Sequence, residues 1–358
     1  MIYSRFRRAT GRADISKAIL NMLKKPDLSD EKIIGCLRDN YDIVAVQIDF
    51  LPLGADRNTA VYRAITVDAD YFVKLRRGDF NQNTVLVPRL LHDQGIAQVI
   101  APLFNKRGHL WTALDSFHVI LYPFIKGESG WERDLSAQNW IELGQALKRI
   151  HTVTLPTTIQ SVQQETFSSF WRSQVREFQS YVETASIDDP VSVELGAFMR
   201  EKKQEISALV FHADRLAAVL QGRNLPFALC HADIHVGNML ITPTGMLYVV
   251  DWDTMILAPK ERDLMFMGSG IGSQATLTAD QQAAFFYQGY GQVETDSAAI
   301  AYYRCERIVQ DAYEYCDQIL LTSGENADRT EGLRQFKSQF EPNGVVDRAL
   351  RSVTNTPH

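Results

Sequence analysis

The sequence predicts an α+β protein in which a small lobe of antiparallel β-strands precedes a larger, mainly helical lobe. Two observations support this prediction. Up to residue 124, short runs rich in β-branched and aromatic residues are separated by turn residues such as Gly54-Ala55-Asp56. From residue 136 onward, apolar residues recur mostly at helical spacing over long segments.

The first lobe is expected to contain β-strands and two helices. A helix over residues 29–40 comes first, because the cap-like Ser29 leads into Ile33 and Leu37 at helical spacing. A second helix, at about 84–94, interrupts the strands. The predicted strands cover residues 43–50, 60–67, 71–75, 109–113 and 117–124.

The second lobe is expected to be helical, with one β-hairpin. The hairpin consists of residues 239–241 and 246–250, joined by a turn that contains Pro243 and Gly245. The predicted helices cover residues 136–151, 167–185, 191–220, 279–290 and 297–321.

These patterns divide the chain into four parts. We expect an N-terminal extension at 1–26, a nucleotide-binding lobe at 27–121, a hinge at 122–127 and a catalytic lobe at 128–350. The Arg-rich opening MIYSRFRRATGR lacks the apolar segment of a secretory signal. Either the extension is a disordered leader, or the native chain starts at Met22.

The composition is that of an ordinary globular protein, with 45% hydrophobic and 22% charged residues among 358. A net charge of -6 provides no basic face for nucleic acid, and no apolar run approaches the roughly 18 residues that span a bilayer. The four cysteines have neither a CxxC pair nor zinc-ligand spacing. We therefore expect reduced thiols, a cytoplasmic location, and no nucleic-acid or membrane partner.

The stretch HADIHVGN, residues 231–238, predicts a phosphoryl-transfer loop. It matches the catalytic-loop pattern H-x-D-x-x-x-x-N, which precedes a strand in kinases. Asp233 would orient a hydroxyl and accept its proton, and Asn238 would bind Mg²⁺ through its amide oxygen. By itself, the stretch fits a surface loop with an Asx turn equally well.

The same stretch does not favour zinc. His231 and His235 have the spacing of a helical zinc pair, but Ala232 stands where a zinc protease has its Glu. Gly237 and the strand that follows also argue against a helix. We expect His231 to brace the loop by hydrogen bonds.

Three further features complete the expected machinery. Asp251 follows the apolar run Leu247–Val250, at the place of the kinase metal-binding Asp, and Asp253 is a second acid. Lys74 lies in the β-like run YFVKL and is either an outward-facing edge residue or a phosphate-binding lysine. The turn before Asn58 and Thr59 falls where a kinase hairpin covers the ATP phosphates, although it has only one glycine.

With these residues in view, the chain resembles the aminoglycoside phosphotransferases, and most of all the spectinomycin phosphotransferase branch. The resemblance runs from about residue 27 to about residue 346, and the segment after DWD is its most specific part. It implies a bilobal protein-kinase-like fold and ATP- and Mg²⁺-dependent phosphorylation of an antibiotic hydroxyl. The adenine would be held at the hinge by Tyr122, Pro123, Phe124 and Ile125. The segments that carry the resemblance include LGADRNTAVY, YFVKL, LYPFIKG, CHADIHVGN and VVDWDTMILAPKERDLMF.

One position departs from the family pattern. Kinase-like folds pair the small-lobe lysine with a Glu on the following helix, and here Gln82 stands at the expected position. A neutral amide can accept a hydrogen bond from Lys74 but without the charge assistance of a carboxylate, so Lys74 would be held less firmly. Asp79 could instead be the partner of Lys74. On this reasoning, converting Gln82 to Glu would improve kcat/KM for ATP.

The acceptor is less well defined by the sequence. Asp253, Glu306, Arg307 and Asp311 are candidate substrate contacts, although charged residues on one helix usually form a solvated face. A cationic aminocyclitol would favour the acids among them. Asp263 is expected to be a helix cap that supports the wall of the site. Two alternatives stay open: a kinase of a metabolite such as homoserine, choline or methylthioribose, and a nucleotide-binding module with little turnover.

Overall fold

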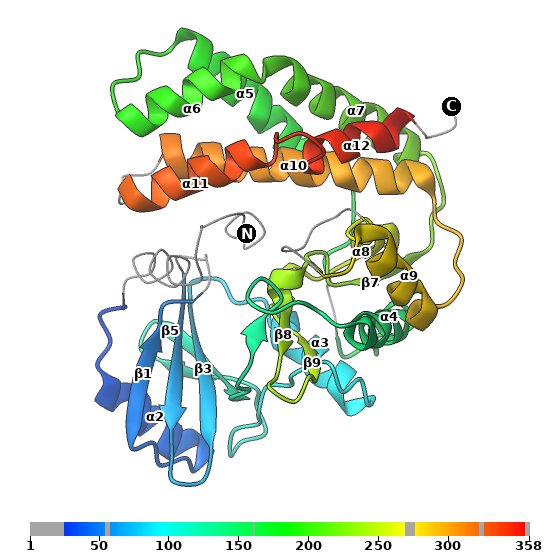
Figure 1. Ribbon diagram of the computed structural model, residues 1–358. Helices are drawn as coiled ribbons and strands as arrows, with labels where there is room; N and C mark the ends of the chain where they lie inside the picture. Colours follow the sequence, from blue (N-terminus) through cyan, green and yellow to red (C-terminus); the bar gives the residue numbers. More distant parts are fainter. Residues whose placement is uncertain (1–24, 54–57, 160–161, 269–275, 322–325, 355–358) are drawn as a thin grey trace.

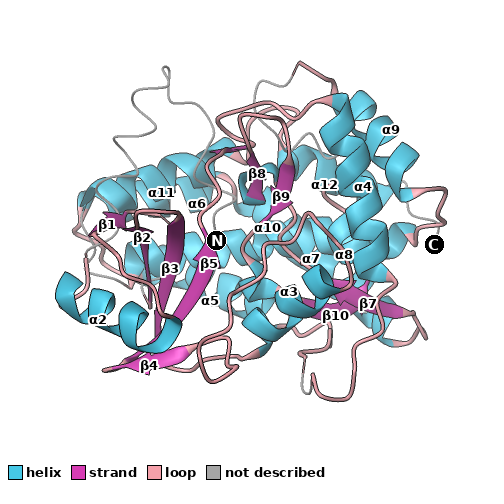
Figure 2. Ribbon diagram, turned by 90° about the horizontal axis from the view of Figure 1, so that it is seen from below, coloured by secondary structure: helices cyan, strands magenta, loops and turns pink. Residues whose placement is uncertain are grey.

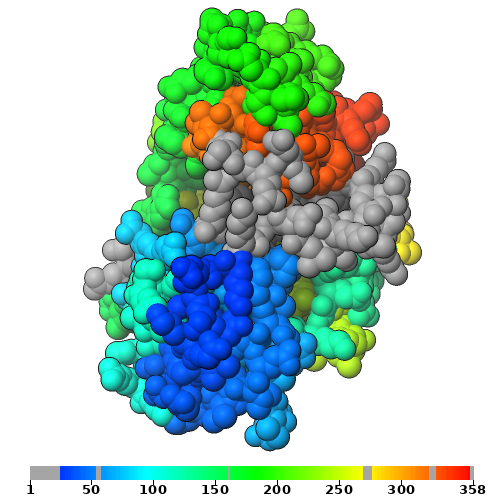
Figure 3. All heavy atoms as spheres, turned by 90° about the vertical axis from the view of Figure 1, so that its left-hand side faces the viewer, coloured from blue at the N-terminus to red at the C-terminus, as the bar shows by residue number. Residues whose placement is uncertain are grey.

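The computed structural model describes residues 25–53, 58–159, 162–268, 276–321 and 326–354. The predicted N-terminal extension therefore lies almost wholly outside the described residues. Figure 1 shows a β-sheet with one helix against it at one end of the molecule and layers of helices at the other. In the space-filling view of Figure 3, the sheet region is blue and the helices of residues 170–221 are green.

The first lobe is built on a five-stranded antiparallel sheet with the order β1-β2-β3-β5-β4. Its core contains Tyr62, Val73, Leu75 and Leu121, none of which is exposed. The first strand, predicted from residue 43, begins only at residue 47. The strands are β1 (Gln47–Leu51), β2 (Thr59–Ile65), β3 (Asp70–Arg77), β4 (Thr112–Leu114) and β5 (Phe117–Pro123).

Both helices predicted for this lobe are confirmed. Helix α2 (Asp30–Tyr41) buries Ile33 and Leu37 against the sheet, and its C-cap residue Asp42 has a φ of 58°. Helix α3 (Asn83–Asp93) packs differently, because its Val87 and Leu91 belong to the core of the helical lobe. In Figure 2, α2 lies beside the sheet, whereas α3 lies toward the helices.

A loop and a small sheet connect the two lobes. Strand β5 ends at Pro123, and residues 124–127 lead without regular structure to β6 (Glu128–Ser129). Strand β6 pairs with β8 (Met239–Ile241), which forms the predicted hairpin with β9 (Leu247–Val249). The segment predicted as a hinge therefore runs directly into the sheet that carries this hairpin.

The helical lobe begins with α4 (Ala137–His151), which crosses α9 (Ala279–Tyr290) closely. A Cβ on Gly144 would lie 2.1 Å from the Phe286 carbonyl oxygen, so only glycine permits this approach. The remaining helices surround α10, which carries fifteen buried residues. Helix α10 covers Ser297–Leu320, and the helices around it are α5 (Phe170–Thr184), α6 (Pro190–Glu201), α7 (Lys203–Gln221), α11 (Asn326–Ser338) and α12 (Val345–Thr354).

The helical lobe differs from the sequence prediction in two ways. The single helix expected over 191–220 is two helices, because the chain leaves helical geometry at Lys202, where φ is -93° and ψ is 16°. Several elements were also missed: the two C-terminal helices α11 and α12, the short strand β7 (Phe227–Cys230), its antiparallel partner β10 (Ile256–Pro259) and α8 (Glu261–Leu264). None of the described helices is long and apolar enough to cross a membrane.

Candidate active site

The predicted catalytic loop leaves β7 at Cys230 and ends in a 3-10 turn, η1 (Val236–Asn238), which leads directly into β8. Gly237 is required in this turn. A Cβ there would lie 2.0 Å from Nε1 of Trp131. The loop is buried: Asp233 is 3% exposed and Asn238 is 1% exposed.

The β8–β9 hairpin brings Asn238 and Asp251 to the same place. Met239 pairs with Val249, and the Val250 amide donates to the Asn238 carbonyl at 2.9 Å. Asp251 therefore directly follows Val250, the residue whose amide bonds to Asn238. Its backbone adopts a left-handed conformation with a φ of 66°, which turns the chain out of the strand into η2 (Trp252–Thr254).

The Asn238 side chain is oriented as a metal ligand requires. Its Nδ2 donates to the Asp233 carbonyl at 2.9 Å and lies 3.3 Å from Oδ2 of Asp233. Its Oδ1 is buried and has no hydrogen-bond partner among the described residues. A buried acceptor oxygen without a partner is costly, and amide and carboxylate oxygens suit Mg²⁺. The residues present therefore fit this ion.

Asp263, at the start of the apolar segment after DWD, holds the backbone of the catalytic loop. Its Oδ2 accepts the His231 amide at 2.9 Å, and its Oδ1 accepts the Ala232 amide at 2.7 Å. Ala232 has a φ of 67°, a strained conformation for a residue with a Cβ. Nε2 of His151 lies 3.0 Å from Oδ2 of Asp263, and Tyr290 bonds the other ring nitrogen. Asp263 is therefore not the helix cap that the sequence predicted. It does support the wall of the site.

His231 braces the loop, as predicted. Its Nε2 lies 3.0 Å from the Val250 carbonyl, and its own carbonyl accepts the Thr254 hydroxyl at 2.9 Å. The ring also packs edge-on against Trp252. These contacts join the catalytic loop to the segment that carries Asp251, so the two are positioned together.

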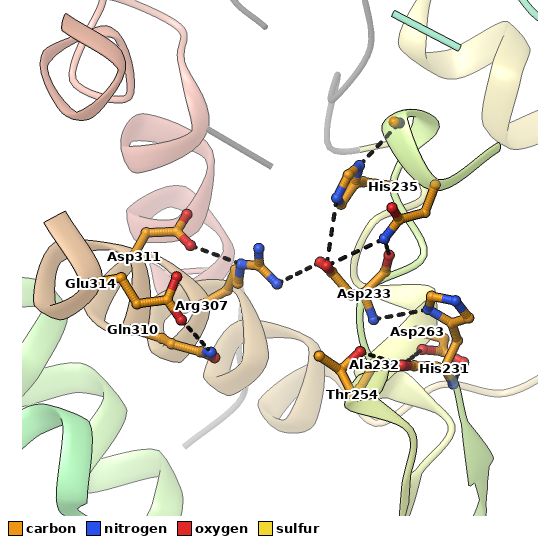
Figure 4. A network of polar contacts seen from close by, with 12 residues as sticks. His231, Ala232, Asp233, His235, Thr254, Asp263, Arg307, Gln310, Asp311 and Glu314 are labelled. Carbon is orange, nitrogen blue, oxygen red and sulfur yellow. Dashed lines mark hydrogen bonds and ion pairs between the residues drawn. The ribbon is translucent and has the colours of Figure 1, made fainter. Parts of the chain in front are cut away.

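The carboxylate of Asp233 lies between two basic side chains (Figure 4). Nη1 of Arg307 donates to its Oδ1 at 2.7 Å, and Nε2 of His235 lies 3.6 Å from its Oδ2. Burial works to raise the Asp233 pKa, but Arg307 and His235 hold that pKa well below its usual value. Burial also lowers the pKa of His235, whose Nδ1 accepts the Gly237 amide. These two directions favour the ionised form of Asp233 and the neutral form of His235.

Lys74 has a different partner from the one that the sequence predicted. Its Nζ donates to Oδ2 of Asp253 at 2.8 Å, and Arg76 donates to the same oxygen at 2.8 Å. Burial works to lower the Lys74 pKa, but Asp253 and Asp251 outweigh it and raise that pKa. Gln82 lies exposed at the start of α3 and has no hydrogen bond to Lys74.

The pairing of Lys74 with Asp253 corrects two expectations. Asp253, predicted as a substrate contact, is the acid that anchors the small-lobe lysine. The exposed Gln82 side chain does not contact Lys74. Arg76 was overlooked, although its two-residue spacing from Lys74 on strand β3 places both cations on one face of the sheet.

The expected nucleotide contacts border this cluster. Tyr122 pairs with Phe72 on β3, and burial raises its pKa to about 12. Pro123, Phe124 and Ile125 follow it and are half-buried. In the predicted phosphate turn, residues 54–57 lie outside the described residues. Asn58 and Thr59 lead into β2, and the Asn58 carbonyl accepts the Arg77 amide at 2.8 Å.

The three α10 candidates take different positions. Arg307 faces the catalytic loop and donates through Nε to Asp311 at 3.0 Å. Glu306 points elsewhere, because Arg172 of α5 donates to it at 2.6 Å inside the helical lobe. Figure 4 also shows Gln310 and Glu314 on the face of α10 that carries Arg307. The helical spacing 307, 310, 311, 314 would have revealed this face.

Comparison with known proteins agrees with this geometry. Residues 49–295 match the model of the phosphotransferase enzyme family. Spectinomycin phosphotransferase APH(9)-Ia, in a crystal structure with ADP and spectinomycin, shares 34% sequence identity. That match covers 91% of this chain and 99% of the other, with a TM-score of 0.85. Its AMP complex has a TM-score of 0.80 at 34% identity, covering 90% and 98%.

A more distant structure has the same fold. The choline kinase LicA from Streptococcus pneumoniae has a TM-score of 0.54 at 14% identity, covering 91% of this chain and 99% of the other. At such low sequence identity, the match shows only that the two proteins share a fold. A search among curated proteins found no match.

Proposed function

Because this chain belongs to the phosphotransferase enzyme family, we propose that it transfers the γ-phosphoryl group of ATP to a hydroxyl of an aminocyclitol or aminoglycoside antibiotic. Spectinomycin is the first acceptor to test. The 34% identity to spectinomycin phosphotransferase extends over both lobes and nearly all of that enzyme. This is the basis for the substrate class.

The observation that supports the chemistry best is the arrangement of Asn238. Its amide nitrogen donates to the Asp233 carbonyl, and its amide oxygen is buried without a partner among the described residues. Its backbone carbonyl accepts the amide of Val250, the residue before Asp251. Asn238 Oδ1 and Asp251 would hold Mg²⁺, which when bound would neutralise charge on the nucleotide phosphates. A surface loop with an Asx turn would not leave this buried oxygen unpaired.

The protein groups divide the remaining work. Asp233, ionised and held by Arg307, would orient the acceptor hydroxyl and take its proton as the oxygen attacks. Lys74 and Arg76 meet at the Asp253 carboxylate, two residues after Asp251, and would bind the phosphates. The hinge backbone at residues 122–125 would hold the adenine. Phosphoryl transfer needs little more than this positioning and charge stabilisation.

The acceptor side favours a cation. Asp311 and Glu314 lie on α10 on the same side as Arg307, across from the catalytic loop (Figure 4). Asp311 is buried and pairs with Arg307, so Glu314, which accepts a hydrogen bond from Gln310, is the carboxylate of this face that an ammonium group could meet. An acceptor with ammonium groups would therefore be attracted to this side of Asp233.

The test is an ATP-consumption assay with a panel of acceptors: spectinomycin, other aminoglycosides, choline and homoserine. We expect turnover with spectinomycin or a related aminocyclitol and little with the two metabolites. Robust turnover on choline or homoserine alone would refute the antibiotic assignment. If ATP binds but no acceptor supports turnover, the protein is a nucleotide-binding module.

A further inference from the structure

Among the described residues outside the catalytic loop, Arg307 makes the closest contact with the Asp233 carboxylate. We propose that Arg307 is a positioning residue for the catalytic base, and that Asp311 and Gln339 hold it in place from the helical lobe. This inference rests on the proposed role of Asp233 as the base. It assigns to α10 a function that the loop itself does not supply.

The contacts form a continuous chain from the catalytic loop to Gln339, the residue after the end of α11. Arg307 donates through Nη1 to Oδ1 of Asp233 at 2.7 Å and through Nε to Oδ1 of Asp311 at 3.0 Å. The other oxygen of Asp311 accepts Nε2 of Gln339 at 2.8 Å. All four residues are at most 6% exposed. Bonds from two different nitrogens to two separate elements fix the plane of the guanidinium.

Burial makes this arrangement significant. A surface ion pair contributes little, but a carboxylate with 3% exposure depends on its partners for its charge and direction. The loop supplies Asp233 with His235, at 3.6 Å, and with the Asn238 amide, at 3.3 Å. Neither is as close to the carboxylate as Arg307. Of the hydrogen bonds that the described residues make to this carboxylate, the closest therefore comes from α10, 74 residues further along the chain.

Lysine would not reproduce both contacts. An ammonium is a compact charge and lacks the fork that reaches Asp233 and Asp311 at once. We therefore expect Arg307→Lys to keep part of the function and Arg307→Met to keep little. Asp311→Asn leaves Arg307 in place but weakens its second anchor, so its effect should be smaller than that of Arg307→Met.

The experiment measures kcat, KM for ATP and the free energy of unfolding for these variants. Arg307→Met should lower kcat about 10- to 100-fold, as expected for a misplaced catalytic group, while KM for ATP stays within about twofold. Arg307→Lys should recover part of kcat. Guanidinium ions added at millimolar concentration should partly rescue an Arg307→Ala variant and leave the wild type unchanged.

Arg172→Met is the matched control. Arg172 is also buried and bonded to α10, at 2.6 Å from Glu306, but it does not contact Asp233. It should lower stability while leaving kcat per folded enzyme near that of the wild type. If Arg307→Met and Arg172→Met reduce kcat equally, or if Arg307→Met keeps kcat within about twofold, Arg307 is merely structural and the inference is wrong.

Two further results separate this inference from the proposed function. If Asp233→Asn keeps wild-type transfer, the role of Asp233 is wrong and the positioning claim is overturned with it. If no acceptor supports turnover, crystal structures of the wild type and Arg307→Met decide. We expect the Asp233 carboxylate to rotate away from its wild-type direction in the variant, and an unchanged carboxylate would overturn the inference.

Discussion

Replacing Asp263 by Ala should disable the catalytic loop without touching a reacting group. The Asp263 carboxylate accepts the backbone amides of His231 and Ala232 at 2.9 and 2.7 Å and is fully buried. Hydrogen bonds to a charged group contribute about 1.5–3 kcal/mol each, so the two bonds together are worth about 3–6 kcal/mol. Their loss also leaves two buried amides without acceptors.

The loss should appear in both stability and turnover. Ala232 has a φ of 67°, and without Asp263 its amide loses the acceptor that helps to hold this strained conformation. The loop would relax and move Asp233, which should reduce kcat about 100-fold or more. Urea denaturation and steady-state kinetics measure the two effects on the same preparation.

The isosteric Asp263→Asn variant is the graded control. Its amide oxygen can still accept one backbone amide, but its NH₂ group cannot accept the other. We expect it to lie between the wild type and Asp263→Ala in both measurements. If Asp263→Ala loses less than about 1 kcal/mol of stability and keeps kcat within about twofold, the bracing role of Asp263 is wrong.

Three further predictions concern the nucleotide and metal side of the site. Gln82→Glu should change kcat/KM for ATP less than about twofold, because Lys74 already pairs with Asp253. Asp253→Asn, in contrast, should lower kcat/KM for ATP about tenfold. A clear gain in kcat/KM for Gln82→Glu would instead support the expectation from the sequence. Asn238→Ala should raise the Mg²⁺ concentration for half-maximal activity about tenfold or more, and an unchanged Mg²⁺ titration would remove Asn238 as a ligand. Gly237→Ala should cost about 1–3 kcal/mol in urea denaturation, because its Cβ would lie 2.0 Å from the Trp131 ring nitrogen, and wild-type stability would contradict this contact.

Local patterns predicted most of the fold. Strand β3 and helices α4, α9 and α10 were located from periodicity to within a few residues of their ends. The break at Lys202 was not, because apolar residues continue at helical spacing on both sides of it. Strands β7 and β10 were missed because each is four residues long and is defined by pairing with the other.

In the candidate site, too, local spacing predicts some of the contacts and tertiary packing determines the others. Asp233, Asn238 and Asp251 are close in sequence, so their spacing predicts their roles. The partner of Lys74 is 179 residues away, at Asp253, and depends on how the two lobes face each other. Arg307 likewise meets Asp233 only because α10 crosses behind the catalytic loop. A spacing rule cannot reveal contacts made by tertiary packing.

The central claim is phosphoryl transfer to a small acceptor hydroxyl with Asp233 as the base. Its most direct test is the transfer of a labelled γ-phosphoryl group from ATP to spectinomycin, for wild type and Asp233→Asn at saturating Mg²⁺, with nucleotide affinity measured by calorimetry. We predict labelled spectinomycin with the wild type, and none with the variant, although both bind ATP equally. Label transfer by Asp233→Asn at the wild-type rate, or no transfer by a wild type that binds both ligands, would contradict the claim.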